Sequence, residues 1–287
     1  MPPLKFVNGA YRTPPRQVPA LYRAFPSLAF HPRLIRSVFH YSAEAKRGRY
    51  GDQQWIDHSL YVMRVLESVG CQFEITGVDH LERLDGPCVI AANHMSTLET
   101  AVLPSIVQPI LPVTFVVKQS LIDYPVFRHI MRARNPIAVS QTDPRSDLKT
   151  MLHDGAARIA EGVSLVVFPE GRRSPVFDPA RFNTIAVKLA HRAQAPVVPL
   201  ALYTNAWSLG RGQFTDFGRI YPQEKVRFAF GEPLRVTGRG ADENRAIIDF
   251  IEEHLERWRI EDGRPAPSPA DLLPEPAGLK AYQAGDV

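Results

Sequence analysis

Between Cys71 and Phe230, short apolar segments alternate with longer stretches in which apolar residues recur at helical spacing. This alternation predicts an α/β fold: a largely parallel central sheet flanked by helices. The segments expected to form strands are Gln72–Thr76, Cys88–Ala92, Val113–Val117, Ile137–Val139, Ser164–Phe168, Val197–Tyr203 and Val226–Phe230. Helices are expected at Leu98–Val107, Tyr124–Met131, Arg145–Glu161, Thr184–Gln194 and Asp242–Arg259.

The first fifty residues differ from the rest in charge. They contain nine Lys or Arg against one acidic residue, Glu44, and so carry +8, whereas the whole chain carries +4. Aromatic residues are interleaved with these cations, which is typical of a segment that lies on an anionic membrane surface. A nucleic-acid partner, a solvated basic arm and an Arg-rich transit peptide are the alternatives. We expect the membrane surface and no nucleic acid.

The amino-terminal region is expected to form a helical hairpin. Residues 1–32 are rich in proline and are predicted to be irregular, and a helix is predicted over Pro32–Arg49. A second helix is predicted between an N-cap at Asp52 and a C′ glycine at Gly70. The hairpin either docks on a membrane or covers one face of the sheet, and the two roles are compatible.

Three regions follow from these patterns. We predict an arm and hairpin over residues 1–70, an α/β domain over 71–260, and a flexible Pro- and Ala-rich tail over 261–287. Prolines interrupt the most apolar stretch, Ala101 to Val117, so no continuous membrane span is expected. The chain is therefore expected to meet a membrane peripherally.

A histidine and a carboxylate follow the strand expected at Cys88–Ala92. In the segment Asn93-His94-Met95-Ser96-Thr97-Leu98-Glu99, the pattern S-x-x-E predicts a capping box with Ser96 as N-cap and Glu99 in the first helical turn. That explains Glu99 structurally but leaves His94 unexplained. If the two side chains meet, Glu99 accepts from one imidazole nitrogen and leaves the other to act as a base.

Cations follow two other expected strands. After Val163–Val167 comes Phe168-Pro169-Glu170-Gly171-Arg172-Arg173-Ser174, in which Gly171 permits a tight turn and the two arginines supply guanidinium groups suited to a phosphate. Lys118 directly follows Phe115-Val116-Val117 and is a further candidate for an anion contact. The alternative is a polar turn with solvated arginines.

Several familiar active sites are absent from the sequence. The segment Gly162-Val163-Ser164-Leu165-Val166 lacks the second glycine of a serine hydrolase elbow, and no P-loop or H-E-x-x-H is present. A metal-dependent hydrolase that uses His94, Glu99 and Glu170 is disfavoured, because no second histidine lies at ligand spacing. We expect no metal.

The two polar segments together resemble a known family. Asn93-His94-x-Ser96-x-x-Glu99 resembles the N-H-x-S-x-x-D box of the glycerolipid acyltransferases, and Phe168–Ser174 resembles their F-P-E-G-T-R-S box. Weaker family blocks occur at Lys118 to Pro125 and at Val197-Val198-Pro199-Leu200. The resemblance extends from about Gln72 to Phe230 and is strongest to bacterial 1-acylglycerol-3-phosphate acyltransferases.

This resemblance implies transfer of a fatty acyl group from a thioester, acyl-CoA or acyl carrier protein, to a lysophospholipid hydroxyl, without a cofactor. It implies His94 as general base, Glu99 as its orienting acid, and a peripheral enzyme on the cytoplasmic face of the bacterial inner membrane. The expected substrate-binding residues are Ser96, Lys118, Glu170, Gly171, Arg172 and Arg173.

The sequence departs from the family pattern in three places. Glu99 stands where the family has aspartate, and Arg172 stands where it has threonine. In the block after Lys118, Ser120 stands where a glutamate is common, Arg128 where a glycine is common, and Gln141 near where an arginine is common. Two alternative functions therefore remain open at the level of sequence. One is acyl transfer to a different lysolipid head group, and the other is a membrane-bound lipid-binding or scaffold protein with the same fold and little or no turnover.

Overall fold

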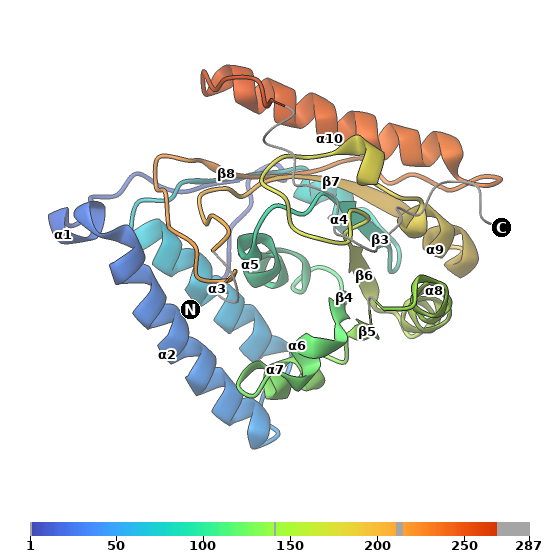
Figure 1. The fold of residues 1–287 in the computed structure, drawn as a ribbon, viewed down its shortest axis with the longest axis horizontal. Coiled ribbons are helices and arrows are strands. Elements are labelled where there is room, and N and C mark those ends of the chain that lie inside the picture. The colour runs from blue at the N-terminus through green and yellow to red at the C-terminus, as the bar shows by residue number, and fades with distance from the viewer. Residues whose placement is uncertain (1, 141, 211–214, 269–287) are drawn as a thin grey trace.

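The computed structural model describes residues 2–140, 142–210 and 215–268. In this part of the chain, eight strands form one sheet in the spatial order β1-β2-β8-β7-β3-β6-β4-β5 (Figure 1). The strands are β1 (Tyr11–Arg12), β2 (Phe73–Thr76), β3 (Val89–Ala92), β4 (Val113–Lys118), β5 (Ile137–Val139), β6 (Ser164–Val167), β7 (Val197–Tyr203) and β8 (Val226–Phe230).

Most strand pairs in the sheet are parallel. Strand β3 lies between β6 and β7 and is parallel to both, and β4 is parallel to β6 and β5. The pairs β1–β2 and β7–β8 are antiparallel, while β2 and β8 are parallel. The predicted α/β fold with a largely parallel sheet is confirmed. The carboxyl ends of β3, β6 and β4 consequently meet at one edge.

Helices cover both faces of the sheet (Figure 1). Strand residues alternate between two apolar clusters: Ile90 and Ala92 of β3 pack with α3 and α5, and Val89 and Ala91 pack with α9 and α10. The helices are α1 (Ala20–Ala24), α2 (Pro26–Lys46), α3 (Asp52–Ser68), α4 (Val78–Glu82), α5 (Thr97–Val107), α6 (Gln119–Asp123), α7 (Phe127–Ala133), α8 (Pro144–Ala160), α9 (Ile185–Ala193) and α10 (Ala241–Glu261).

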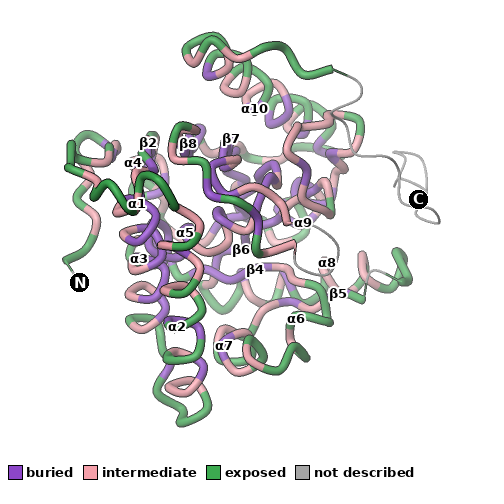
Figure 2. Tube along the Cα trace, turned by 60° about the vertical axis from the view of Figure 1, so that its left-hand side comes forward, coloured by how far each residue is buried: buried purple, intermediate pink, exposed green. Residues whose placement is uncertain are grey.

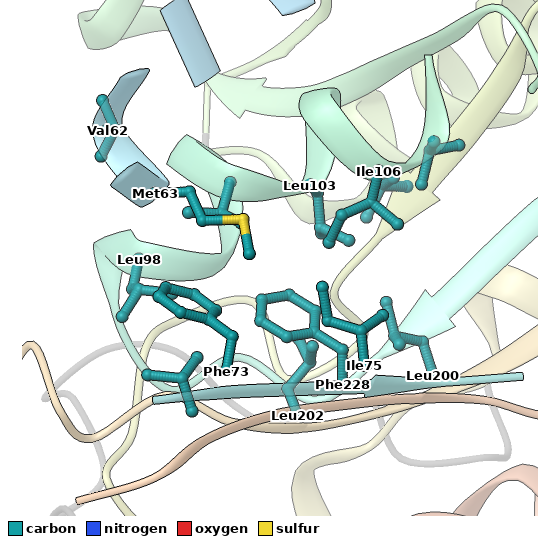
Figure 3. Close-up of a cluster of buried hydrophobic side chains, with 14 of the residues drawn as sticks. Val62, Met63, Phe73, Ile75, Leu98, Leu103, Ile106, Leu200, Leu202 and Phe228 are labelled. Carbon is teal, nitrogen blue, oxygen red and sulfur yellow. The ribbon is translucent and has the colours of Figure 1, made fainter. Parts of the chain in front are cut away.

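The cluster beneath α3 and α5 forms the larger part of the core. Figure 3 shows Met63 of α3 and Leu98 and Leu103 of α5 facing Phe73 and Phe228 on the sheet, and all five side chains are fully buried. Burying each such side chain contributes about 1.5–3 kcal/mol to folding relative to leaving it exposed. The helix that carries Glu99 is therefore held firmly against the sheet.

The prediction that residues 1–32 are irregular was wrong. Strand β1 pairs with β2, and α2 begins at Pro26 and continues through Pro32. Proline is well suited to the first helical position, where its missing N–H is not needed. Further along, Phe30 is fully buried, with its ring centroid 4.8 Å from that of Trp207, and this packing stabilises the turn that contains Pro32.

Two other predicted helix boundaries were also wrong. The helix expected over Tyr124–Met131 is α7, which begins only at Phe127 and ends at Ala133. Tyr124 precedes Pro125 and is extended, with ψ 123°, so it ends the short helix α6 instead of starting the next one. The N-cap of α3 is Gly51 rather than Asp52, which occupies the first helical position. Gly70, in contrast, follows the C-cap with φ +107°, as the predicted C′ glycine requires.

The amino-terminal helices cover one face of the sheet. Helix α3 packs on α5, and α2 lies outside α3 and beside α7, where Ser42 donates to the carbonyl of Val126 at 2.7 Å (Figure 1). Figure 2 shows buried residues concentrated along the central strands and exposed residues along α2. Within the described residues, no helix is both long and apolar enough to cross a bilayer. From residue 269 onward, the predicted tail lies outside the described residues.

Candidate active site

The two polar segments meet at the carboxyl ends of adjacent parallel strands. Asn93 follows β3, and its side chain pairs with β7 as a strand residue would: its amide nitrogen donates to the carbonyl of Leu202 at 2.9 Å, and its amide oxygen accepts from the N–H of Leu202 at 2.8 Å. Asn93 is fully buried. Its side chain thus prolongs the β3–β7 pairing by one residue and fixes the point from which His94 emerges.

His94 is held by the second segment on three sides. Its backbone N–H donates to Oε2 of Glu170 at 2.8 Å, and its carbonyl accepts from the N–H of Ser174 at 2.8 Å. The imidazole stacks on Phe168 with a centroid distance of 4.1 Å and an interplanar angle of 19°. Backbone and ring are therefore both immobilised by residues that follow β6.

The imidazole of His94 meets the carboxylate of Glu99. The Nδ1 atom lies 2.9 Å from Oε1 of Glu99, which also accepts from the backbone N–H groups of Met95 and Ser96 at 2.7 and 2.8 Å. A carboxylate in this position accepts the Nδ1–H and leaves the lone pair on Nε2. Within the described residues Nε2 makes no hydrogen bond, and 17% of the side chain is exposed.

Glu99 is 0% exposed, yet its charged form is favoured. Burial alone would raise the pKa of this carboxyl, but the hydrogen bond and charge of His94, the hydroxyl of Thr204 and the N–H of Ser96 together hold the pKa below its usual value. The hydroxyl of Thr204 lies 2.6 Å from Oε2. The dyad therefore contains an ionised, fully enclosed acid.

Ser96 supports this arrangement from the start of α5. Its hydroxyl accepts from the N–H of Leu98 at 3.1 Å, while Glu99 accepts from the N–H of Ser96, so the predicted capping box is confirmed. Ser96 is 1% exposed, and its hydroxyl also contacts Glu99 and Thr204. The structure thus places Ser96 as a cap and as a neighbour of the carboxylate, behind the exposed edge of His94.

Glu170 is held by backbone N–H groups on both sides of the site. Its carboxylate accepts from the backbone of His94 and from the backbone at Asp178. Desolvation raises the pKa of Glu170 to about 8, and the nearby carboxylates of Asp178 and Glu99 act in the same direction. Its position therefore links the two segments.

The other predicted residues lie at or just after the carboxyl ends of β6 and β4. Gly171 has φ +70°, which favours glycine at this turn. Arg172 and Arg173 are partly buried, and Arg173 reaches Thr97, Thr215 and Asp216. Lys118 is the exposed last residue of β4, which is separated from β3 by β6.

Sequence reasoning missed Thr204 and Asp216. Thr204 directly follows β7, so the rule that strand ends gather polar site residues would have identified it. Asp216 lies in an irregular segment with no motif, and no signal in the sequence marks it. In the part of the chain that the structure describes, no group of three or more His, Cys, Asp or Glu side chains is arranged to bind a metal.

Comparisons with known proteins identify the family of this chain. A family model described as "Acyltransferase" matches residues 72–203. The 1-acyl-sn-glycerol-3-phosphate acyltransferase of Pseudomonas aeruginosa is 31% identical over 213 residues, which cover 74% of this chain and 76% of that protein.

This chain belongs to the acyltransferase family. A second relative, the chloroplastic 1-acyl-sn-glycerol-3-phosphate acyltransferase BAT2 of Brassica napus, is 31% identical over 163 residues, which cover 56% of this acyltransferase and 44% of the relative. A crystal structure of the 1-acyl-sn-glycerophosphate acyltransferase PlsC from Thermotoga maritima shares the fold. Its TM-score is 0.62 and its sequence identity 18%, with 86% of this acyltransferase and 99% of that chain covered.

The raised pKa of Glu170 predicts a pH dependence of the stability of this acyltransferase. Between about pH 4.5 and pH 8 the folded chain keeps a proton on Glu170 that the unfolded chain has released, so the free energy of unfolding falls as pH rises. Glu170→Gln retains the neutral shape and should flatten this fall. Urea unfolding between about pH 5 and 8 measures the slope.

Glu44→Gln is the matched control for this experiment. The hydrogen bond from Arg49 lowers the pKa of Glu44, so this carboxyl titrates below the window and its replacement should leave the slope unchanged. A Glu170→Gln slope equal to that of the unsubstituted protein would show that Glu170 is ionised in the folded state at neutral pH.

Proposed function

We propose that this acyltransferase moves a fatty acyl group from an acyl thioester to the free hydroxyl of a lysophospholipid, 1-acylglycerol-3-phosphate, and so forms phosphatidate. The observation that carries the proposal is the His94–Glu99 pair at 2.9 Å, in which Nε2 of His94 makes no hydrogen bond to any residue that the structure describes. The relatives named 1-acyl-sn-glycerol-3-phosphate acyltransferase support this acceptor. The proposed donor is acyl-CoA or acyl carrier protein.

The chemistry follows from the state of the dyad. Nε2 of His94 takes the proton of the acceptor hydroxyl as its oxygen forms the ester bond with the thioester carbonyl carbon. The carbon–sulfur bond then breaks, and the departing thiolate receives the proton from Nε2. Glu99 stabilises the imidazolium that exists between the two steps, and its anionic form is already favoured in the resting site. The acceptor supplies the nucleophile, so no covalent acyl-enzyme is required.

The acceptor phosphate is assigned to the cationic side of the site. Arg172 and Arg173 follow β6, and Lys118 is the last residue of β4, so all three lie at the same sheet edge as His94. A guanidinium group offers two parallel N–H donors to a phosphate, and Arg173 already lies across the amino-terminal end of α5 through Thr97. The positive end of that helix adds to the attraction for an anion.

His94→Ala should abolish acyl transfer, because the acceptor hydroxyl then has no base. Purified protein with an acyl thioester and lysophosphatidate should release free thiol, and the substitution should lower the rate by about 10²–10⁴-fold. Parallel assays with other lysophospholipids and lyso-aminolipids, and with both thioester carriers, identify the acceptor and donor.

Thiol release by His94→Ala at the unsubstituted rate contradicts the catalytic role. Lipid binding without thiol release for any acceptor indicates the scaffold alternative.

Glu99→Gln separates the two roles of Glu99. Glutamine keeps an acceptor oxygen for His94 Nδ1 and for the N–H groups of Met95 and Ser96, but it has no charge to stabilise the imidazolium. We expect kcat to fall by about 10²-fold while the thermal unfolding temperature changes little. Glu99→Asp, one methylene shorter, withdraws the carboxylate from Thr204 and tests whether the longer acid is needed. If Glu99→Gln lowers kcat and the thermal unfolding temperature together, Glu99 serves only to cap the helix.

We further propose that the amino-terminal helices dock this enzyme on an anionic membrane, on the cytoplasmic side. Leu28 and Ile35 are seven residues apart and Phe39 follows four residues later, so the three share one face of α2, and all are exposed. Helix α7 packs beside α2, and α6 packs on α7 (Figure 1). Leu121 of α6, Tyr124 between the two helices and Phe127 of α7 are also exposed and extend this surface. Arg36, Lys46, Arg128 and Arg132 are exposed on the same helices and are suited to anionic head groups.

Phe39→Asp should weaken binding to vesicles that contain phosphatidylglycerol. Phe39 is 58% exposed, so its replacement costs little folding energy but removes about 1.5–3 kcal/mol of apolar burial in the bilayer, which corresponds to at least tenfold in binding. Vesicle co-sedimentation measures the effect. Ile260→Asp is the matched control, since Ile260 is 64% exposed on α10. Equal losses for both variants would place the docking surface elsewhere.

A further inference from the structure

The guanidinium group of Arg173 is already held at its Nη1 end. Nη1 donates to the hydroxyl of Thr97 and to the carboxylate of Asp216, and Nη2 donates to the hydroxyl of Thr215 at 3.1 Å. The hydroxyl of Thr97 in turn lies 2.8 Å from Asp216. Arg173 therefore belongs to a closed group of three polar neighbours.

These contacts leave the other edge of Arg173 available. An arginine has five N–H donors, and three of them are used by Thr97, Asp216 and Thr215. In the part of the chain that the structure describes, no acceptor takes the Nε–H or the second N–H of Nη2, and the side chain is 24% exposed. Nε–H and an N–H of Nη2 form a fork that matches two phosphate oxygens.

Asp216 itself is fixed by a rigid support. The indole Nε1 of Trp207 donates to its carbonyl at 3.2 Å, and Trp207 is 1% exposed against Phe30 of α2. Nearby, Nε2 of His31 lies 2.9 Å from the carbonyl of Gly218. These contacts anchor the backbone of Asp216, and a carboxylate on an anchored backbone is suited to hold Arg173 in one orientation.

We propose that Asp216 is a positioning residue that orients Arg173 toward an anionic acceptor head group and so sets the preference for acceptors that carry a phosphate. This inference rests on the proposed function, in which Arg173 binds the acceptor phosphate. Asp216 acts through Arg173 and touches no reacting atom. Without the carboxylate, the flexible side chain of Arg173 samples several rotamers. Binding of the acceptor must then supply the conformational entropy cost of ordering that side chain, which weakens the binding.

The test compares Asp216→Ala, Asp216→Asn and Asp249→Ala in steady-state assays of thiol release. Asp249 is the matched control: it pairs with Arg245 at 2.8 Å and is 46% exposed, against 48% for Asp216. The acceptors are lysophosphatidate and 1-monoacylglycerol of the same chain length, which lacks the phosphate. Each variant is also assayed for its KM for the acyl thioester and for its thermal unfolding temperature.

Asp216→Ala should raise KM for lysophosphatidate about tenfold, which is the scale of one charge-assisted hydrogen bond. Its kcat and its KM for the thioester should stay within about twofold of the unsubstituted enzyme, so its preference for lysophosphatidate over monoacylglycerol falls about tenfold. Asp216→Asn keeps an acceptor oxygen, so its KM for lysophosphatidate should lie between those of Asp216→Ala and the unsubstituted enzyme. Asp249→Ala should match the unsubstituted enzyme.

Other outcomes overturn the inference in distinguishable ways. A lowered KM in both Asp216 variants would show that the carboxylate competes with the phosphate for Arg173. A fall in unfolding temperature and kcat with acceptor preference unchanged would assign Asp216 a structural role only. If the unsubstituted protein releases no thiol with lysophosphatidate, the proposed function fails, whereas normal turnover with unchanged KM in Asp216→Ala removes this inference alone.

Discussion

An ionised carboxylate with no exposed surface persists in a fold only where donors surround its oxygens, and Glu99 is such a group. Its donors come from places far apart in sequence: His94, the backbone at Met95 and Ser96 at the start of α5, and Thr204 after β7. The ends of β3 and β7 must therefore lie side by side before the charge is satisfied. The parallel pairing of these strands and the Asn93 bridge between them meet that requirement.

The same constraint explains why the segment Phe168–Ser174 does more than carry cations. Glu170, Ser174 and Phe168 hold the backbone and ring of His94, so the imidazole is positioned by the segment after β6 while Glu99 is positioned by α5. In the proposed function, His94 and the head-group contact of Arg173 both depend on this one short segment. Such rigidity limits the geometries that the imidazole samples, which a general base requires.

Much of this arrangement was predictable from local patterns. The alternation of apolar segments located the strands of the parallel sheet, and S-x-x-E located the start of α5. What local patterns do not encode is contact between distant segments. Pro32 lies inside α2 because Phe30 packs against Trp207, far along the chain. The same holds for the contact of Glu170 with the backbone of His94 and for that of Asp216 with Arg173. Each joins segments that are distant in sequence and meet only when the sheet has formed.

The contact between Phe30 and Trp207 has a practical consequence for protein engineering. Both side chains are almost completely buried, one on the outer helix α2 and the other in the segment that carries Asp216. Deleting the amino-terminal helices to obtain a more soluble enzyme would uncover the indole and release the hydrogen bonds that Ser27 and His31 make with Ile220 and Gly218. The helices at the surface are thus part of the folding unit of the site, and solubility is better sought by replacing exposed side chains one at a time.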